Sequence, residues 1–191
     1  MECGARNRFK GKAETRKEAL SRNGTKARWV IAGSNQSPEE SIFHTACLEL
    51  AKRFLKLRLI LVPRHPERFE EVANMIAATG LHWLRRTTCQ TAVTDPGWRI
   101  FLGDTVGELR WWWGLADVGF VGGSFGDRGG QNMIEPCAYG VATCFGPNTL
   151  NFSDIVRLLL DEKASEQLQT PEDLQPWLES MLSETTKREQ M

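Results

Sequence analysis

The sequence predicts a doubly wound α/β domain built on a parallel, Rossmann-like sheet. Short apolar runs of β-forming residues alternate with longer amphipathic segments between residues 28 and 161, and this alternation is typical of βαβ units. Glycines and polar residues follow most of the apolar runs. A length of 191 residues with a hydrophobic content of 41% fits one domain with a continuous core.

Six apolar runs are expected to form strands, and the segments between them are expected to form helices. The expected strands are 28–33, 58–62, 82–85, 99–102, 118–121 and 141–145. The expected helices are 38–54, 66–79, 106–116, 131–139 and 152–161. Proline followed by acidic residues at 38–40 and 66–67 marks two of the helix starts.

The two ends of the chain differ in composition from the centre. Residues 1–27 are rich in Lys, Arg, Asn and Gly and predict a disordered tail or linker remnant. The folded domain is expected to span 28–186, with 187–191 as a tail. Within it, 165–169 could form an edge strand, and Thr170-Pro171-Glu172 predicts the start of a last helix that runs to about residue 185.

The composition narrows the classes of partner. Lys plus Arg and Asp plus Glu both number 24, so no global field favours nucleic acid or an acidic membrane surface. The five cysteines are scattered without a Cys-x-x-Cys pair, which favours a reduced protein and suggests no zinc site. No apolar run approaches the roughly 18 residues of a transmembrane helix. We therefore expect a soluble, cytoplasmic chain without a cofactor or metal.

Polar and glycine-rich loops follow five of the expected strands. In an open parallel sheet, ligands bind beyond the carboxyl ends of the strands, so these loops are expected to converge on one edge. The loops begin at Ser34-Asn35-Gln36, Pro63-Arg64-His65, Gly103-Asp104-Thr105, Gly122-Gly123-Ser124 and Gly146-Pro147-Asn148.

The stretch from Gly122 to Pro136 is the strongest single feature. Its glycines allow close backbone approach, and a helix that begins near Gln131 would aim backbone N–H groups at a phosphate. Glu135 would lie in the first turns of that helix and accept hydrogen bonds from two ribose hydroxyls. The structural alternative is a glycine-rich turn in which Glu135 only caps the helix.

Three other residues are candidates for the site, and each also has a purely structural alternative. Asp104 could cap a helix whose amides at 106–108 face the cleft, or be an ordinary N-cap without a ligand. Arg64, directly after an apolar strand, is the best candidate for a fixed charge on a phosphate, although it could be a surface arginine. His65 could bind the phosphate but is more often structural in such a place. The tryptophans at 111–113 are expected to pack in the core and not to stack on a base.

Five segments of the chain resemble, in order and spacing, the carboxy-terminal half of the bacterial Kdo (3-deoxy-D-manno-octulosonic acid) transferases. Together they fall within residues 29–160, most of the expected domain. The segments are 62–69 (VPRHPERF), 103–109 (GDTVGEL), 116–124 (ADVGFVGGS), 129–136 (GGQNMIEP) and 145–152 (FGPNTLNF).

The resemblance implies one domain of a GT-B glycosyltransferase that uses CMP-Kdo as donor and a lipid A precursor as acceptor in lipopolysaccharide biosynthesis. It implies a cytoplasmic location or one peripheral to the cytoplasmic face of the inner membrane. No metal or cofactor is implied. The residues expected to bind the donor are Arg64, His65, Thr105, Val106, Gly107, Glu108, Leu109, Gly122, Gly123, Ser124, Gly129, Gly130, Gln131, Asn132, Met133, Ile134 and Glu135.

The resemblance also implies that some functional residues of the family lie in a second domain. The family's catalytic glutamate and acceptor surface belong to an amino-terminal domain, so no catalytic residue is expected here and the chain alone is expected to be inactive. Residues 34–40 (SNQSPEE) replace the familiar Ser-Thr-His-x-Gly-Glu-Glu, and Gln131 stands where many members have His. The open alternative is a non-catalytic nucleotide-binding module or relic. A dinucleotide oxidoreductase is disfavoured because the first strand lacks the G-x-G-x-x-G fingerprint.

Overall fold

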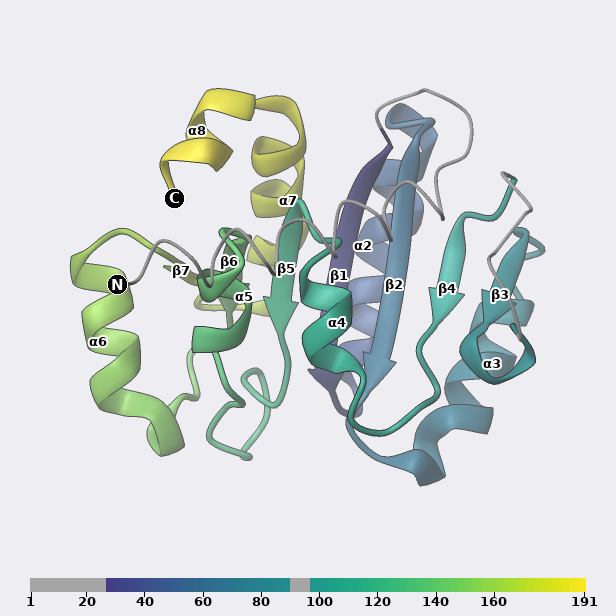
Figure 1. Ribbon diagram of the computed structural model, residues 1–191, viewed down its shortest axis with the longest axis horizontal. Coiled ribbons are helices and arrows are strands. Elements are labelled where there is room, and N and C mark those ends of the chain that lie inside the picture. The colour runs from purple at the N-terminus through teal and green to yellow at the C-terminus, as the bar shows by residue number, and fades with distance from the viewer. Residues whose placement is uncertain (1–26, 90–96) are drawn as a thin grey trace.

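The computed structural model describes residues 27–89 and 97–191, which form one seven-stranded parallel sheet with helices on both faces (Figure 1). The sheet order is β3-β4-β2-β1-β5-β6-β7, and every described strand pair is parallel. The predicted doubly wound fold is confirmed. The strands are β1 (Arg28–Asn35), β2 (Leu57–Pro63), β3 (Trp83–Arg85), β4 (Ile100–Leu102), β5 (Val118–Val121), β6 (Ala142–Phe145) and β7 (Glu166–Gln167).

Alternating residues of β1 enter two separate hydrophobic cores. Val30 and Ala32 face the core made with α2 (Glu39–Arg53), α3 (Phe69–Ala77) and α7 (Leu174–Ser183). Trp29 and Ile31 face the core that includes α4 (Leu109–Trp113) and α6 (Ser153–Asp161). A strand buried on both faces reads as a continuous apolar run, which is why the sequence identified β1 so readily.

The topological switch point of the sheet lies between β1 and β5. These two strands are neighbours in the sheet, although more than eighty residues separate them in the chain. From β1, the chain adds β2 on one side, whereas β5 and β6 continue on the other side. Because all carboxyl ends point the same way, the loops after β1 and β5 diverge and open a crevice at this point.

Two helices at the carboxyl edge are shorter than the sequence predicted. The helix expected at 106–116 forms only as α4, because Gly107 adopts φ +83°, which an α-helix cannot contain. The helix expected at 131–139 begins only at α5 (Ile134–Ala138). There the Asn132 side chain accepts a hydrogen bond from the Ile134 amide at 3.1 Å, a local turn that competes with the helix.

The carboxy-terminal region packs against the sheet. The expected edge strand forms as β7 beside β6, and the last predicted helix appears as a one-turn 3-10 helix (Pro171–Asp173) followed by α7. A further helix, α8 (Thr185–Gln190), crosses the boundary expected at residue 186. Buried Arg188 of α8 donates a hydrogen bond to the Met181 carbonyl at 2.7 Å, which anchors this end. The expected tail at 1–27 lies almost wholly outside the described residues.

None of the described helices combines the length and the apolar character that a membrane span requires.

Candidate functional site

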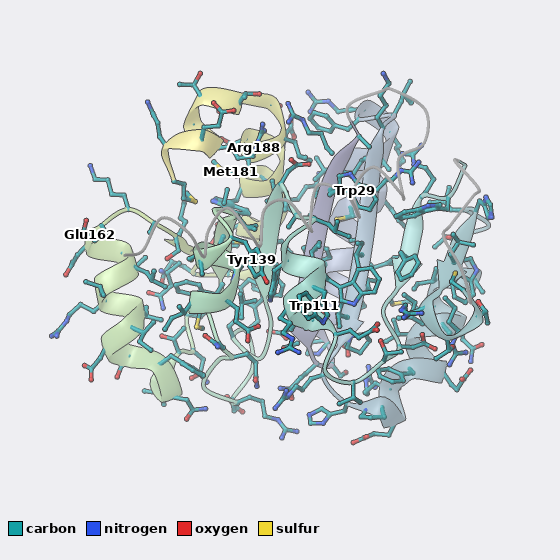
Figure 2. All side chains as sticks on the ribbon, viewed as in Figure 1. Trp29, Trp111, Tyr139, Glu162, Met181 and Arg188 are labelled. Atoms are coloured by element: carbon teal, nitrogen blue, oxygen red, sulfur yellow. The ribbon has the colours of Figure 1, made fainter. Side chains whose placement is uncertain are left out.

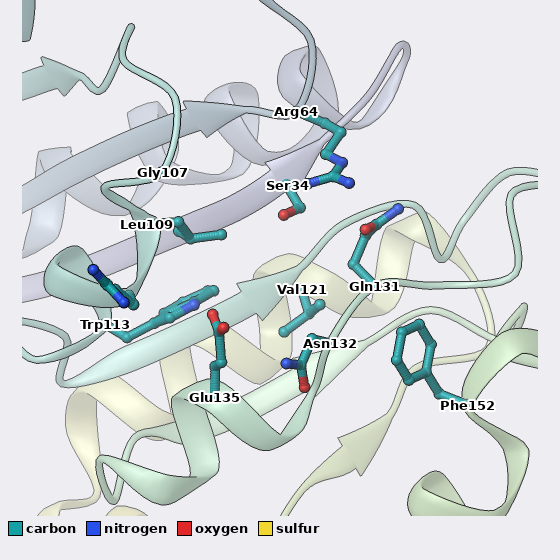
Figure 3. Close-up of a pocket in the computed structure, with 11 residues that line it drawn as sticks. Ser34, Arg64, Gly107, Leu109, Trp113, Val121, Gln131, Asn132, Glu135 and Phe152 are labelled. Carbon is teal, nitrogen blue, oxygen red and sulfur yellow. The ribbon is translucent and has the colours of Figure 1, made fainter.

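A pocket of about 560 Å³ opens at the carboxyl edge of the sheet, beside the switch point (Figure 3). Its walls combine two arginines, one carboxylate, polar side chains and apolar rings. The residues that line it are Ser34, Arg64, Gly107, Leu109, Arg110, Trp113, Val121, Gln131, Asn132, Glu135 and Phe152.

The pocket draws residues from all five of the predicted loop regions. Ser34 is the second-last residue of β1, Arg64 follows β2, and Gly107 lies between β4 and α4. Glu135 belongs to α5 beyond β5, and Phe152 follows β6. The expectation that five loops converge at one edge is therefore confirmed, and the pocket stands where ligands bind in doubly wound sheets.

Arg64 contributes an exposed guanidinium to the wall of the pocket. Its backbone amide donates to the Asn35 carbonyl at 3.0 Å, which ties the loop after β2 to the end of β1. Its side chain lines the pocket next to Ser34 (Figure 3) and makes no ion pair within the described part of the chain. An exposed, unpaired arginine at a pocket wall is suited to a bidentate bond with an anion.

Two other arginines are each paired with a carboxylate. Arg68 pairs with Glu40 at 3.4 Å, and Arg86 pairs with Glu108 at 2.8 Å. Arg64 is thus set apart from them.

Ser34 has an unusual backbone conformation at the mouth of the pocket. It has φ +57° and lies where the register between β1 and β2 shifts, between Gly33 and Asn35. Positive φ is uncommon for residues other than glycine and clusters at functional sites. In Figure 3 the Ser34 side chain lies beside that of Arg64.

Glu135 lies in the first turn of α5 and points into the pocket from the side opposite Arg64 (Figure 3). Asn132 and Gln131 precede it on the same wall. No acceptor is found within the described residues for the amides of Gln131 and Asn132. This wall therefore offers both donors and a carboxylate acceptor.

The charges of Glu135 and Arg110 shift the pKa of Tyr139 in opposite directions. Burial raises the pKa of the Tyr139 hydroxyl, the Glu135 charge raises it further, and the Arg110 charge opposes both. Trp111 on α4 and Tyr139 just after α5 are labelled in Figure 2. Arg110 stacks over the Trp111 ring, with 4.7 Å between the guanidinium carbon and the ring centre.

The amides of the glycine-rich loop after β5 bind a carboxylate of the protein itself. Glu39 of α2, only 2% exposed, accepts hydrogen bonds from the amides of Gly123 (2.6 Å), Ser124 (2.8 Å) and Phe125 (2.9 Å). The sequence suggested that this loop would cradle a phosphate. That interpretation needs correction for these three amides, because Glu39 already fills the position that an external anion would take.

Asp104 is not the helix cap that the sequence suggested. It is buried and accepts hydrogen bonds from the Arg85 side chain, from the Thr87 amide at 2.9 Å and from the Thr87 hydroxyl at 2.6 Å. Burial alone would raise the pKa of Asp104, but the bonds from Arg85 and Thr87 outweigh it and lower the pKa. Because α4 begins only at Leu109, Asp104 instead fastens the turn after β3 to the loop after β4.

Trp113 lines the pocket, although the sequence predicted only a packing role for it. It is 1% exposed, and its ring lies against β1 and β5 at two glycines, Gly33 and Gly119. Its ring also forms one wall of the pocket (Figure 3). The paired glycines below the ring were the one signal in the sequence that could have placed it.

The structure brings part of the predicted site together. Predicted residues that line the pocket are Arg64, Gly107, Leu109, Gln131, Asn132 and Glu135. Predicted residues outside its lining are His65, Thr105, Val106, Glu108, Gly122, Gly123, Ser124, Gly129, Gly130, Met133 and Ile134. Lining residues absent from the prediction are Ser34, Arg110, Trp113, Val121 and Phe152. Contact of any of them with a donor stays a prediction.

Comparison with known proteins finds several relatives of the same name. A 3-deoxy-D-manno-octulosonic acid transferase of Haemophilus influenzae is 34% identical over 164 residues, which cover 85% of this chain and 38% of the relative. The enzyme of the same name from Bordetella pertussis is 37% identical over 172 residues, or 88% of this chain and 40% of the relative. The chain thus spans about two fifths of the length of these relatives. No family model matches it.

Solved structures agree with the sequence relatives. The crystal structure of the C-terminal CMP-Kdo binding domain of WaaA from Acinetobacter baumannii superposes with a TM-score of 0.85 at 32% identity, and covers 96% of this chain and 94% of that one. The C-terminal domain of a group 1 glycosyl transferase, LpcC of Francisella tularensis, has a TM-score of 0.60 at 10% identity, which supports the fold alone. The chain belongs to the family of carboxy-terminal domains of 3-deoxy-D-manno-octulosonic acid transferases.

Proposed function

We propose that the pocket binds CMP-Kdo and that the chain acts as the donor-binding half of a Kdo transferase. The observation that supports this proposal most directly is the position of Arg64 opposite Glu135 at the switch point of the sheet, because Arg64 makes no ion pair with any described residue. Support comes from the A. baumannii domain, which is described as CMP-Kdo binding and matches nearly the whole chain.

The phosphate and the ribose of CMP each have a suitable partner in the pocket. The Arg64 guanidinium can form two hydrogen bonds with the donor phosphate, and the Ser34 hydroxyl lies beside it. Across the pocket, the Glu135 carboxylate can accept hydrogen bonds from the two ribose hydroxyls, as acidic residues do in nucleotide-binding sheets. Gln131 and Asn132 supply hydrogen-bond donors between the phosphate and the ribose.

The chemistry we propose is displacement of CMP by an acceptor hydroxyl. The hydroxyl oxygen forms a bond to the anomeric carbon of Kdo, the bond from that carbon to the phosphate oxygen breaks, and its electron pair leaves with CMP. Negative charge grows on the departing phosphate, and Arg64 can stabilise it there. A general base must take the hydroxyl proton.

We place that base outside the part of the relatives that this chain matches. The chain spans 38% and 40% of two relatives, so the remainder of such a protein has room for a second domain. In our proposal, that domain supplies the base and holds a lipid A precursor at the cytoplasmic face of the inner membrane. The chain alone is then expected to transfer no Kdo to the acceptor, and detectable transfer by it would overturn this assignment.

Calorimetry tests donor binding directly. The wild-type chain is expected to bind CMP more tightly than NAD, and Glu135→Ala is expected to lose about tenfold in CMP affinity, since bonds to a charged group are worth about 1.5–3 kcal/mol. Glu162→Ala, a change of an exposed glutamate just beyond α6, is the matched control. Absence of CMP binding, or equal affinity in Glu135→Ala, would contradict the proposal.

A further inference from the structure

The Glu39 carboxylate is bound entirely by backbone amides. Besides the amides of Gly123, Ser124 and Phe125, it accepts a hydrogen bond from the Gln36 amide at 3.1 Å. No cation pairs with it within the described residues. Consecutive amides that converge on one point form an anion-binding concavity of the kind that often holds phosphate. Here the protein fills that concavity with its own carboxylate.

The segment that Glu39 holds is linked to the pocket wall. The Gly123 carbonyl accepts from the Gly130 amide at 2.8 Å, and Gln131 and Asn132 follow directly. A side chain on Gly123 would lie 3.2 Å from Gln131 Cγ, so the two residues are close. Fixing Gly123 therefore restricts where the Gln131 and Asn132 side chains can lie.

The same segment also reaches the loop after β6. The Ser124 carbonyl accepts from the Asn148 amide at 2.9 Å, and the Ser124 hydroxyl accepts from the Gly146 amide at 2.8 Å. One buried carboxylate at the start of α2 thus connects the loops after β1, β5 and β6. These are three of the five loops that form the pocket.

We propose that Glu39 is a positioning residue for nucleotide binding, which acts by occupying the anion concavity of the glycine-rich loop and so preforms the wall that carries Gln131 and Asn132. The tests of this role that measure CMP binding rest on the proposed function. Without the carboxylate, the amides of residues 123–125 lack an acceptor, and the loop samples other conformations. A binding-competent state that is populated only in part lowers the apparent affinity in proportion.

One variant removes the charge of Glu39 and keeps the volume of its side chain. Glu39→Gln keeps the size of the side chain, but its NH₂ group would face amide donors. Glu40→Gln is the matched control, because Glu40 is equally buried at the next position of α2 but pairs with Arg68. Glu39→Gln is expected to lose about tenfold in CMP affinity by calorimetry, and Glu40→Gln is expected to bind CMP as the wild type does.

Chemical rescue gives a readout that a purely structural role would not produce. In Glu39→Ala, the vacated concavity should accept acetate, and acetate should restore most of the CMP affinity, whereas it should not strengthen binding in the wild type. Folding of each variant is checked by circular dichroism. If Glu39→Ala does not fold, Glu39→Gln alone decides. Unchanged CMP affinity in Glu39→Gln, or a folded Glu39→Ala that acetate leaves unimproved, overturns the proposal.

A ligand-free measurement keeps this proposal separate from the proposed function. The side-chain amide NMR signals of Gln131 and Asn132 are expected to shift in Glu39→Gln and to stay in place in Glu40→Gln. If the wild type binds no CMP but these signals shift, the proposed function fails while the positioning of the wall stands. If the signals do not move, the positioning role is wrong, whatever CMP does.

Discussion

Trp113 packs directly on Gly33: a Cβ at position 33 would lie 2.8 Å from Cη2 of the indole ring. The ring also lines the pocket, so the absence of a side chain at Gly33 helps to define the shape of the site. Gly119 on the neighbouring strand has the same relation to the ring, with 3.0 Å to Cζ3. Two strands of the sheet are therefore shaped to accept one tryptophan.

Gly33→Ala is expected to destabilise the fold by about 2 kcal/mol, because the added methyl group would overlap the Trp113 ring in a packed core. Urea unfolding measures this change. Gly126→Ala is the control, since a Cβ there meets nothing within 4 Å. A smaller ring in Gly33→Ala/Trp113→Phe should recover part of the loss, and strict additivity of the two changes would argue against the contact.

Arg64→Met is expected to weaken CMP binding by about tenfold or more without altering the fold, because a charged hydrogen bond to the phosphate is lost from an exposed side chain. Arg157→Met, at an exposed arginine of α6, serves as the control for the loss of one positive charge. Calorimetry compares the two variants. Equal affinities in the two would show that Arg64 does not contact the ligand.

Arg110→Met is expected to reduce CMP affinity by a few fold, and the effect should shrink as the salt concentration rises. Arg110 lines the pocket and is held over Trp111, where it adds positive charge near an anionic ligand. Titrations at two ionic strengths check this. A loss that does not change with salt would mean that Arg110 makes a direct contact instead.

Asp104→Asn is expected to cost about 2 kcal/mol at pH 7, because Arg85 loses its buried carboxylate partner. The pKa of Asp104 is lowered in the fold from its ordinary value near 3.8. Its stabilising contribution is therefore full above that value and is lost as the pH falls through the lower folded value. Unfolding at several pH values should show the wild type and variant converging in acid, and a constant difference would refute the linkage.

The sequence could predict β1 to β6 because each lies in an apolar run that is visible without knowledge of the fold. It also predicted the edge of the sheet at which the pocket opens, since Arg64 and Glu135 follow strands whose carboxyl ends must meet in a parallel sheet. Helix starts were less predictable. The positive φ of Gly107 and the turn made by Asn132 depend on local geometry that composition does not reveal.

The bonds between Glu39 and the glycine-rich loop could not be predicted from the sequence. They join residues 84 to 86 positions apart, and a carboxylate in the first turn of a helix has a sufficient local explanation in the helix dipole. Without the fold, nothing links that carboxylate to the amides after β5. The position of Trp113 in the pocket was also not predicted, because it depends on two glycines that lie in different strands.

A crystal structure of the chain with CMP would show where the nucleotide binds. We expect the phosphate within hydrogen-bond distance of the Arg64 guanidinium, the ribose hydroxyls on the Glu135 carboxylate, and the Gly123–Phe125 amides still bound to Glu39. CMP bound elsewhere, or its phosphate seated on the Gly123–Phe125 amides in place of Glu39, would contradict this expectation.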